Sequence, residues 1–342
     1  MTLQSELKSS WLKLKEDFPR LRIKDAAEQL DVAEMELTQC VEGVIRLKEN
    51  FQDQFLEIGN LGLVMALTRN ESIVHECKGK YQNISFNKHV GLVLGSTIDL
   101  RIFPKKISHA FFVPVQQANN KLLSIQFFDA YGVAVHKVYL LNNNNRSIHQ
   151  AFVKKFTHEK QIQLFPIKEK NKDVLTEKID TQTFLDDWAN LQDTHDFYPL
   201  LVKNKINRFT ALKIAEGAFT EKVSNSTTEK LLQNAVNEEV EIMIFVSSGA
   251  VIQIYSGNIY NVKKSGHWLN VLDPEFNLHL RDDHIVNTWI VKKPTADGIV
   301  TSLEIFDNKN KNIATFFGSR KPGIPESLEW RNILASSKKR SL

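Results

Sequence analysis

LVMALTRNESIVHECKGKYQNI, the stretch at Leu63–Ile84, is matched 178 residues later by EIMIFVSSGAVIQIYSGNIYNV at Glu241–Val262. At the same offset, SIQFFDAYG from Ser124 lies over SLEIFDNKN from Ser302. Between them, DLRIF at Asp99–Phe103 falls near HLRDD, shifted by two more residues. Three matches in the same order indicate an internal duplication. A unit this long is typical of a duplicated domain, because solenoid units run to only about 20–50 residues.

Each half shows the same order of predicted elements. A helical region, at about residues 5–50 and again at 181–238, has apolar residues at helical spacing. Short β-branched and aromatic strands follow, with turn signals between them such as Asp129–Gly132 and Asp307-Asn308. Because the turns contain no helices, the strands are expected to pair antiparallel. The pattern predicts an α+β fold built as a tandem repeat.

The two halves are predicted as an N-terminal repeat at residues 1–165 and a C-terminal repeat at residues 181–342. The stretch from about Phe165 to Asp180 is rich in Lys, Glu and Asp, and it is expected to be the linker. A tight, exposed loop is expected at Asn142–Asn145.

The composition excludes several classes of protein. Hydrophobic residues make up 42% of the chain and charged residues 25%, and no stretch approaches the roughly 20 apolar residues of a membrane span. The first 18 residues are charged and have no apolar core, unlike a secretory signal. Two cysteines fit a reducing cytoplasm. A net charge of +4, spread over 44 basic and 40 acidic residues, does not favour a nucleic-acid partner.

The usual motifs of nucleotide, zinc and serine-hydrolase chemistry are absent. The sequence contains no GxxxxGK[ST], GxGxxG, HExxH, paired CxxC or GxSxG. The remaining candidates are histidines, and cations in largely apolar segments. His75 and His136 lie on predicted strands beside Val, Glu and Lys, and both are expected to be half-exposed strand residues.

His195, in DWANLQDTHDFYPLLVKN, is the strongest single candidate. On a helical wheel Trp188, Leu191, His195, Tyr198 and Val202 share one stripe, which predicts an inward imidazole. Such a residue is either a hydrogen-bonded core histidine or an axial haem ligand. Proline lacks the N–H that would bond back four residues, so Pro199 predicts that a helix begins near Asp196 or kinks there.

Three cations in the second half are candidates for binding an anionic ligand. Arg208, Lys293 and Arg320 lie in or near apolar segments. Each alone is compatible with a surface charge whose stem covers apolar residues. Together they could pair with the two carboxylates of a planar apolar ligand such as haem. In the first half, Arg101 shares a strand face with Asp99 and Phe103, and an ordinary strand ion pair is the alternative there.

Taken with DLRIF and KPT, these residues resemble the HemS/ChuS/HmuS family of bacterial haem-handling proteins. The resemblance spans nearly the whole chain and includes LTRNESIVHE, VLDPEF, KPTADGIVTSLEIF and FFGSR, in order. It implies a tandem repeat with a saddle-like antiparallel sheet core flanked by helices. It also implies one haem, bound in the second half between a helix that supplies a histidine and the face of the sheet.

The resemblance implies a role for each candidate residue. His195 would be the axial ligand of the haem iron, and Arg101 would be the catalytic residue on the distal side. Phe103 and Phe245 would pack on the porphyrin, while the cations Arg208, Lys293 and Arg320 would lie near the propionates or the distal pocket. Phe317, in FFGSR, departs from the tyrosine expected before the glycine of this motif. A phenyl ring packs on the macrocycle but donates no hydrogen bond.

Two haem functions remain open from the sequence, beside the alternative of a duplicated α+β protein with no haem role. The first is an enzyme that degrades haem oxidatively and releases iron, with electrons from an external donor. The second is a cytoplasmic haem chaperone or store that receives haem after import and delivers it to a separate oxygenase. Both bind haem through the same residues. A further haem site in the first half, near His75, is a third open point.

Overall fold

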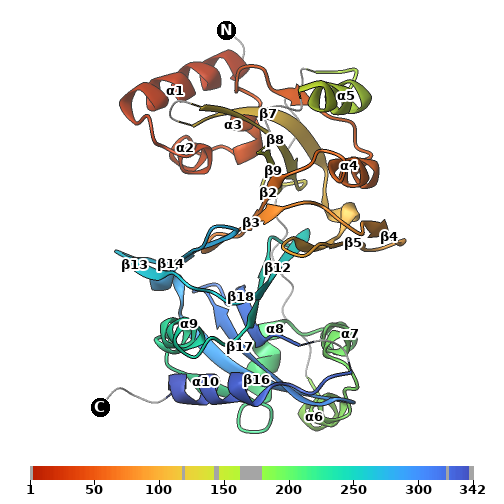
Figure 1. Cartoon of the computed structure of the whole chain (residues 1–342), viewed down its shortest axis with the longest axis vertical. Helices are drawn as coiled ribbons and strands as arrows, with labels where there is room; N and C mark the ends of the chain where they lie inside the picture. Colours follow the sequence, from red (N-terminus) through yellow and green to blue (C-terminus); the bar gives the residue numbers. More distant parts are fainter. Residues whose placement is uncertain (1–2, 118–119, 142–145, 162–178, 321–322, 339–342) are drawn as a thin grey trace. The chain divides into compact units, whose positions relative to one another are not determined.

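The computed structural model describes residues 3–117, 120–141, 146–161, 179–320 and 323–338. The chain divides into two compact units, both visible in Figure 1. The first comprises Met1–Arg69, Glu76–Asn171 and Ser248–Gln253, and the second comprises Asn70–His75, Lys172–Ser247 and Ile254–Leu342. The predicted loop at 142–145 lies outside the described residues, and so does the predicted linker except for its last two positions.

The first half of the chain begins with helices and continues with strands. Its helices are α1 (Leu3–Asp17), α2 (Ile23–Gln29), α3 (Glu34–Thr38), α4 (Phe51–Ile58) and α5 (Arg146–Phe156), with a 3-10 turn η1 (Pro104–Lys106). Its strands are β1 (Ile45–Arg46), β2 (Val64–Arg69), β3 (Ile73–Gly79), β4 (Ser85–Phe86), β5 (Gly91–Leu94), β6 (Asp99–Ile102), β7 (His109–Gln117), β8 (Asn120–Phe128) and β9 (Ala134–Leu140).

The second half repeats this order. Its helices are α6 (Thr181–Ala189), α7 (Phe197–Lys203), α8 (Arg208–Ile214), α9 (Thr227–Asn237) and α10 (Leu328–Lys338), with 3-10 turns η2 (Thr194–Asp196) and η3 (Asp282–His284). Its strands are β10 (Thr220–Val223), β11 (Ile242–Ser247), β12 (Val251–Gly257), β13 (Val262–Ser265), β14 (Trp268–Leu272), β15 (Phe276–Arg281), β16 (Asn287–Thr295), β17 (Gly298–Phe306) and β18 (Asn312–Gly318).

The predicted α+β tandem repeat is confirmed, with three differences. The helices α5 and α10, which follow the strands of each half, were not predicted. The short strands β1 and β10 lie inside regions predicted to be wholly helical. Strands of two to four residues are too short to show a period of two. The helix α4 lies just beyond the first predicted helical region, and its buried residues Phe51, Gln54, Phe55 and Ile58 follow helical spacing.

Antiparallel pairing builds the same sheet in each unit. In the first unit the strand order is β1-β7-β8-β9-β2, and in the second it is β10-β16-β17-β18-β11. A smaller antiparallel ladder, β4-β5-β6 or β13-β14-β15, accompanies each. The predicted turns are confirmed: the amide of Gly132 donates to the carbonyl of Asp129, and that of Asn310 to the carbonyl of Asp307.

Each unit also includes a turn from the other half of the sequence. The segments Asn70–His75 and Ser248–Gln253 are equivalent in the repeat. Asn70–His75 belongs to the second unit, and Ser248–Gln253 belongs to the first. Asn70 Nδ2 donates to the carbonyl oxygen of Ile313 at 2.9 Å. The amide of Phe103 donates to the carbonyl oxygen of Ala250 at 2.8 Å. Neither unit is therefore made from one continuous stretch of chain.

In the second unit, helices cover both faces of the large sheet (Figure 1). On one face, Trp289 and Val291 of β16 pack in a core with side chains of α6, α7 and α8. On the other, α10 lies so close to β18 that a Cβ on Gly318 would lie 2.6 Å from Trp330. None of the helices in the described part of the chain combines the length and apolar character needed to cross a bilayer.

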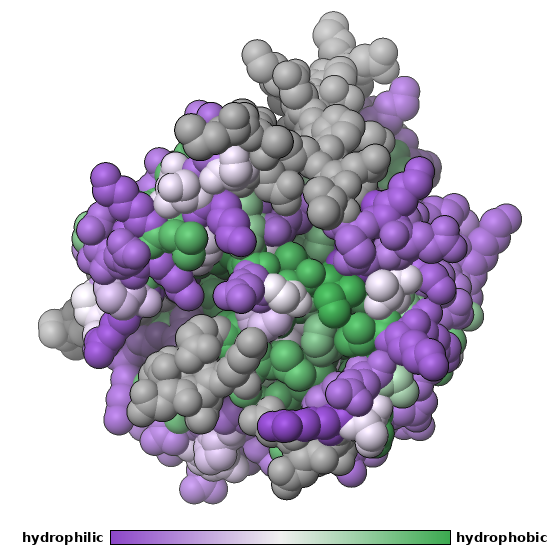
Figure 2. Space-filling model, turned by 90° about the horizontal axis from the view of Figure 1, so that it is seen from above, coloured by the Kyte–Doolittle hydropathy of each residue, from purple (hydrophilic) through white to green (hydrophobic). Residues whose placement is uncertain are grey.

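Some large apolar side chains stay on the surface of the first unit. Figure 2 shows an apolar area on the face seen from above, surrounded by hydrophilic side chains. Large exposed apolar residues of this unit include Leu12, Phe18, Leu56 and Ile148. Apolar exposure of this kind is common on globular proteins, and the candidate site described below uses other residues.

A buried carboxylate with two cations holds α3 onto the sheet of the first unit. Glu34 is 7% exposed, and its Oε1 accepts a hydrogen bond from Lys137 Nζ at 2.7 Å. Arg69 pairs with the other carboxylate oxygen. Burial alone would raise the pKa of Glu34, but the charges of Lys137 and Arg69 outweigh burial and hold this pKa at about 2.

The stability of the first unit should therefore fall in acid. The unfolded chain protonates Glu34 near its ordinary pKa of 4.5, whereas the folded protein does so only near 2. Between these values the unfolded state binds more protons, so the free energy of unfolding decreases as pH falls. We expect Glu34→Gln to weaken this dependence in thermal melts measured across the window. The matched control Glu28→Gln, in the exposed Lys24–Glu28 pair, should keep the wild-type slope. An unchanged slope in Glu34→Gln would contradict this expectation.

Candidate functional site

His195 lies in a short turn between two helices of the second unit. After α6 ends at Ala189, the 3-10 turn η2 contains His195, and α7 begins at Phe197 with Asp196 as its N-cap. The prediction that Pro199 marks a helix start near Asp196 is confirmed.

The predicted apolar stripe through His195 is wrong. Trp188 is fully buried, but Tyr198 and Val202 are 69% and 58% exposed. The imidazole of His195 is 88% exposed, so it is neither inward nor a core histidine. A helical wheel assumes one continuous helix, and the chain leaves helical geometry between α6 and α7.

Asp193 contacts both the backbone and the exposed imidazole of His195. Its Oδ1 accepts hydrogen bonds from the backbone amide of His195 at 2.8 Å and from the ring Nδ1 at 2.5 Å. The pKa of Asp193 is lowered, chiefly by the hydrogen bond from the His195 amide. An ionised carboxylate can only accept, so Nδ1 carries a proton. In the neutral ring, the Nε2 lone pair is then available to a ligand.

The His195 turn is fastened to the hairpin between β16 and β17. The amide of Ala296, in that hairpin, donates to the carbonyl oxygen of Gln192 at 2.9 Å. Arg320, just after β18, lowers the pKa of Asp193 further through its charge. Its side chain is only 13% exposed, and Nη1 lies 3.9 Å from Asp297. Among the described residues, this Nη1 has no hydrogen-bond partner.

Half-buried aromatic residues lie on the sheet face that carries α6–α8. Cross-strand pairing places Phe245 opposite Thr315, and Phe317 opposite Ser302. The rings of Phe245 and Phe317 meet edge to face at 5.2 Å. Both are only partly buried, whereas their neighbours Ile244 and Phe316, on the opposite face, are fully buried. This part of the sheet therefore presents an accessible aromatic surface.

Beside the aromatic surface lies a buried charge cluster. Glu304 of β17 is 0% exposed and accepts two hydrogen bonds from Arg208, from Nε at 2.5 Å and from Nη2 at 2.7 Å. Lys293 Nζ donates to the same carboxylate at 3.3 Å. Burial would raise the pKa of Glu304, but the charges of Arg208 and Lys293 outweigh it and hold the pKa at about 2. Burial lowers the pKa of Lys293 to about 8.

The charge cluster is linked to both the histidine turn and the aromatic surface. Lys293 Nζ lies 4.7 Å from the ring centre of Phe197 and 5.6 Å from that of Phe317. Arg208 lies 5.1 Å from the Phe197 ring. Four of the predicted residues, Arg208, Phe245, Lys293 and Phe317, are thus close together. Asp193, Phe197 and Glu304 were missed, although an aspartate two residues before His195 and an acid in the apolar strand SLEIF are visible in the sequence.

Arg101 and Phe103 belong to the first unit. Arg101 lies on β6 and forms an ion pair with Asp99, as the alternative interpretation of this strand expected. Phe103 follows the strand, and Lys106 Nζ lies 5.2 Å from its ring centre.

His75 and His136 were expected to be half-exposed, and both expectations are wrong. Both side chains are buried, which lowers the pKa of each to about 3. His136 contacts the hydroxyls of Thr68 at 2.8 Å and Tyr81 at 2.6 Å. His75 packs against Phe276 with ring centres 5.0 Å apart. Successive side chains of a strand point to opposite faces. The Val, Glu and Lys residues that flank the two histidines therefore do not show whether the histidines themselves are buried. The structure gives His75 no exposed surface at which to meet a haem.

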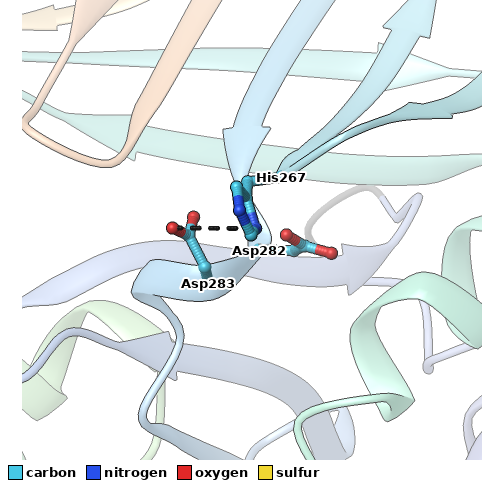
Figure 3. A group of neighbouring side chains, drawn as sticks. All are labelled: His267, Asp282 and Asp283. Atoms are coloured by element: carbon cyan, nitrogen blue, oxygen red, sulfur yellow. Dashed lines mark ion pairs between the residues drawn. The ribbon is translucent and has the colours of Figure 1, made fainter.

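A second group of possible metal ligands lies at the surface of the second unit. His267, Asp282 and Asp283 lie close together in Figure 3, and Nδ1 of His267 lies 3.9 Å from the carboxylate of Asp283. Cations already neutralise both carboxylates: Lys264 pairs with Asp282 at 2.6 Å, and Arg281 binds Asp283 through two nitrogens. The hydrogen bond from Arg281 holds the pKa of Asp283 at about 2. The group is therefore a surface ion-pair network.

Known proteins match both halves of this chain. The model of the haemin-degrading HemS/ChuX domain matches residues 30–156 and 205–336. The hemin transport protein HemS of Yersinia enterocolitica is 34% identical over 339 residues, covering 97% of each chain. The structure of holo-PhuS, a haem-binding protein from Pseudomonas aeruginosa, is 38% identical with a TM-score of 0.94, covering 98% of this chain and 99% of PhuS.

The structure of ChuS, an E. coli haem oxygenase, is 31% identical with a TM-score of 0.88, and the match covers 97% of this chain and 99% of ChuS. The duplication, the helix-then-sheet order of each half and the full-length matches lead to one conclusion. This chain belongs to the haemin-degrading HemS/ChuX family.

Proposed function

We propose that the second unit binds one haem, with Nε2 of His195 as the axial ligand of the iron. Phe245 and Phe317 would pack against the porphyrin. Arg320 would bind a propionate, and Arg208 and Lys293, held by Glu304, would add positive charge beside the ring. Arg101 and Phe103 enter the proposal through the family resemblance alone.

One observation carries this proposal: an exposed imidazole is held by a carboxylate, with its second ring nitrogen available. Metal-binding histidines almost always donate their other ring N–H to such a partner. Two further features fit a porphyrin. The largely buried Arg320 has a nitrogen that lacks a hydrogen-bond partner among the described residues, and a propionate would satisfy it. The accessible aromatic surface would gain about 25 cal/mol for each Å² of apolar area that the macrocycle covers.

The proposed activity is oxidative degradation of haem with release of iron, in the cytoplasm. Bound haem would supply the redox-active iron and is itself the substrate that is oxidised. The reaction needs dioxygen and electrons from an external donor. In this proposal His195 binds and orients the haem, and Arg101 stabilises negative charge that develops during the reaction.

The second candidate is a haem chaperone, which would receive haem after import and deliver it to a separate oxygenase. The 88% exposure of the His195 side chain favours this function, because an exposed ligand is accessible to a partner during transfer. The relatives are likewise named for transport, haem binding and haem oxygenase activity.

A turnover assay separates the two candidates. We expect the haem-loaded protein to lose its Soret band in air with ascorbate, with catalase present to remove free hydrogen peroxide. Arg101→Gln should still bind one haem but degrade it at least about 100-fold more slowly, as expected for loss of a charge-stabilising donor. The matched control is Arg281→Gln, at the equivalent place in the other repeat, which should degrade haem at the wild-type rate. A Soret band that persists, or decays only without catalase, would exclude enzymatic degradation and leave the haem chaperone as the function.

A further inference from the structure

The carboxylate of Asp193 lies directly behind the imidazole of the proposed ligand. We propose that Asp193 is a positioning residue that fixes both the orientation and the tautomer of His195. This inference rests on the proposed haem function for its consequences. The tautomer itself is a property of the haem-free protein.

The geometry gives Asp193 a fixed place relative to the backbone. A single oxygen, Oδ1, accepts both the His195 amide and the His195 ring N–H. In return, Asp196 Oδ2 accepts the amide of Asp193 at 2.9 Å and that of Gln192 at 3.3 Å. The two aspartates close a small hydrogen-bonded loop around the histidine. Because the carboxylate is tied to the same turn as the ring, it restrains the ring even though the side chain is 88% exposed.

Such a restraint has a measurable value for ligand binding. A free surface histidine samples several rotamers, and ordering its side chain on binding costs free energy. A neutral imidazole also exchanges its proton between the two ring nitrogens. The hydrogen bond to Asp193 keeps the proton on Nδ1, so Nε2 remains an acceptor. His195 is therefore prepared for an iron ion before haem arrives.

The charge of Asp193 has a second consequence once haem is bound. A carboxylate partner raises the basicity of a ligating imidazole. The stronger electron donation from Nε2 stabilises oxidised iron more than reduced iron. The positive charge of Arg320 also acts on this carboxylate and limits the effect. Asp193 should therefore make haem in this site harder to reduce.

Two variants separate charge from loop structure. Asp193→Asn keeps an oxygen that accepts the backbone amide but loses the charge, whereas Asp193→Ala loses both. In the haem-free protein, ¹⁵N NMR of the histidine ring should show the Nδ1–H tautomer in the wild type. It should show a mixture of tautomers in Asp193→Ala. The matched control Asp187→Asn removes the charge of a surface carboxylate that pairs with Lys203, and it should leave the ring unchanged.

With haem added, both Asp193 variants should still bind one equivalent, with affinity reduced by about 10–100-fold in Asp193→Ala. At a fixed applied potential, the ratio of reduced to oxidised haem should rise at least tenfold in Asp193→Asn, equivalent to about 59 mV for one electron. A wild-type tautomer in Asp193→Ala, or an unchanged potential in Asp193→Asn, would overturn the inference. A wild-type protein that binds no haem would instead refute the proposed function, and the tautomer measurement would still test Asp193.

Discussion

Replacing Glu304 with alanine should lower the free energy of unfolding of the second unit by about 3–5 kcal/mol, the usual cost of breaking a buried ion pair from one side. Glu304 is fully buried, and both Arg208 and Lys293 bind it. Without the carboxylate, the ammonium of Lys293 would stay buried beside Arg208 with no opposite charge. Its pKa is already lowered to about 8, so Lys293 would lose its proton more readily still.

Urea denaturation followed by tryptophan fluorescence measures this effect well. Four of the five tryptophans, Trp188, Trp268, Trp289 and Trp330, belong to the second unit, so the signal reports mainly its unfolding. The control is Asp187→Ala, which breaks the exposed pair with Lys203 and should cost at most about 1 kcal/mol. If Glu304→Ala lowers the free energy of unfolding no more than the control does, the buried charge cluster does not contribute the expected stability.

An apolar replacement tests whether the cost arises from the unpaired charges. The triple variant Glu304→Leu, Arg208→Met, Lys293→Met removes all three charges together. Apolar side chains of similar volume often replace a buried ion cluster without loss of stability. We therefore expect this variant to recover most of the stability that Glu304→Ala loses. A triple variant as unstable as the single one would show that packing, and not charge, determines the loss.

The duplicated fold was predictable because both halves retain the same local patterns. The short apolar run IMIFV of β11 is visible in the sequence, and so is its counterpart VMAL in β2. Turn residues such as Asp129 and Asp307 also act locally. Pro199 has a fixed backbone requirement, and it placed the start of α7 correctly.

Features that depend on contacts between distant residues were not predictable. Glu304 and Arg208 are 96 residues apart in sequence, and only the strand order brings them together. The reciprocal placement of Asn70–His75 and Ser248–Gln253 leaves no local signal. The same limit explains the error at His195, where the wheel could not show that the helix ends at Ala189.

Replacing His195 with alanine should reduce haem affinity by more than about 100-fold, since even removing the partner behind a metal-ligating histidine costs about 10–100-fold. The residue is exposed, so its removal creates no cavity and should leave the fold intact. Its loss would remove the proposed iron ligand while Phe245, Phe317 and Arg320 remain. Weak binding through these residues would then show a Soret band shifted from that of the wild type.

The matched control for this variant is His267→Ala. His267 is an exposed histidine of the same unit, with its side chain 73% exposed, and it has no part in the proposed site. It should bind haem as the wild type does. Circular dichroism of all three proteins should be the same before haem is added.

The most direct test of the account is a haemin titration of the wild type, His195→Ala and His267→Ala, followed by absorbance in the Soret region. We predict a saturable one-to-one change in the wild type and His267→Ala that is lost or shifted in His195→Ala. Identical saturable titrations in all three proteins would show that a residue other than His195 binds the iron. No binding in the wild type would refute the proposed haem function.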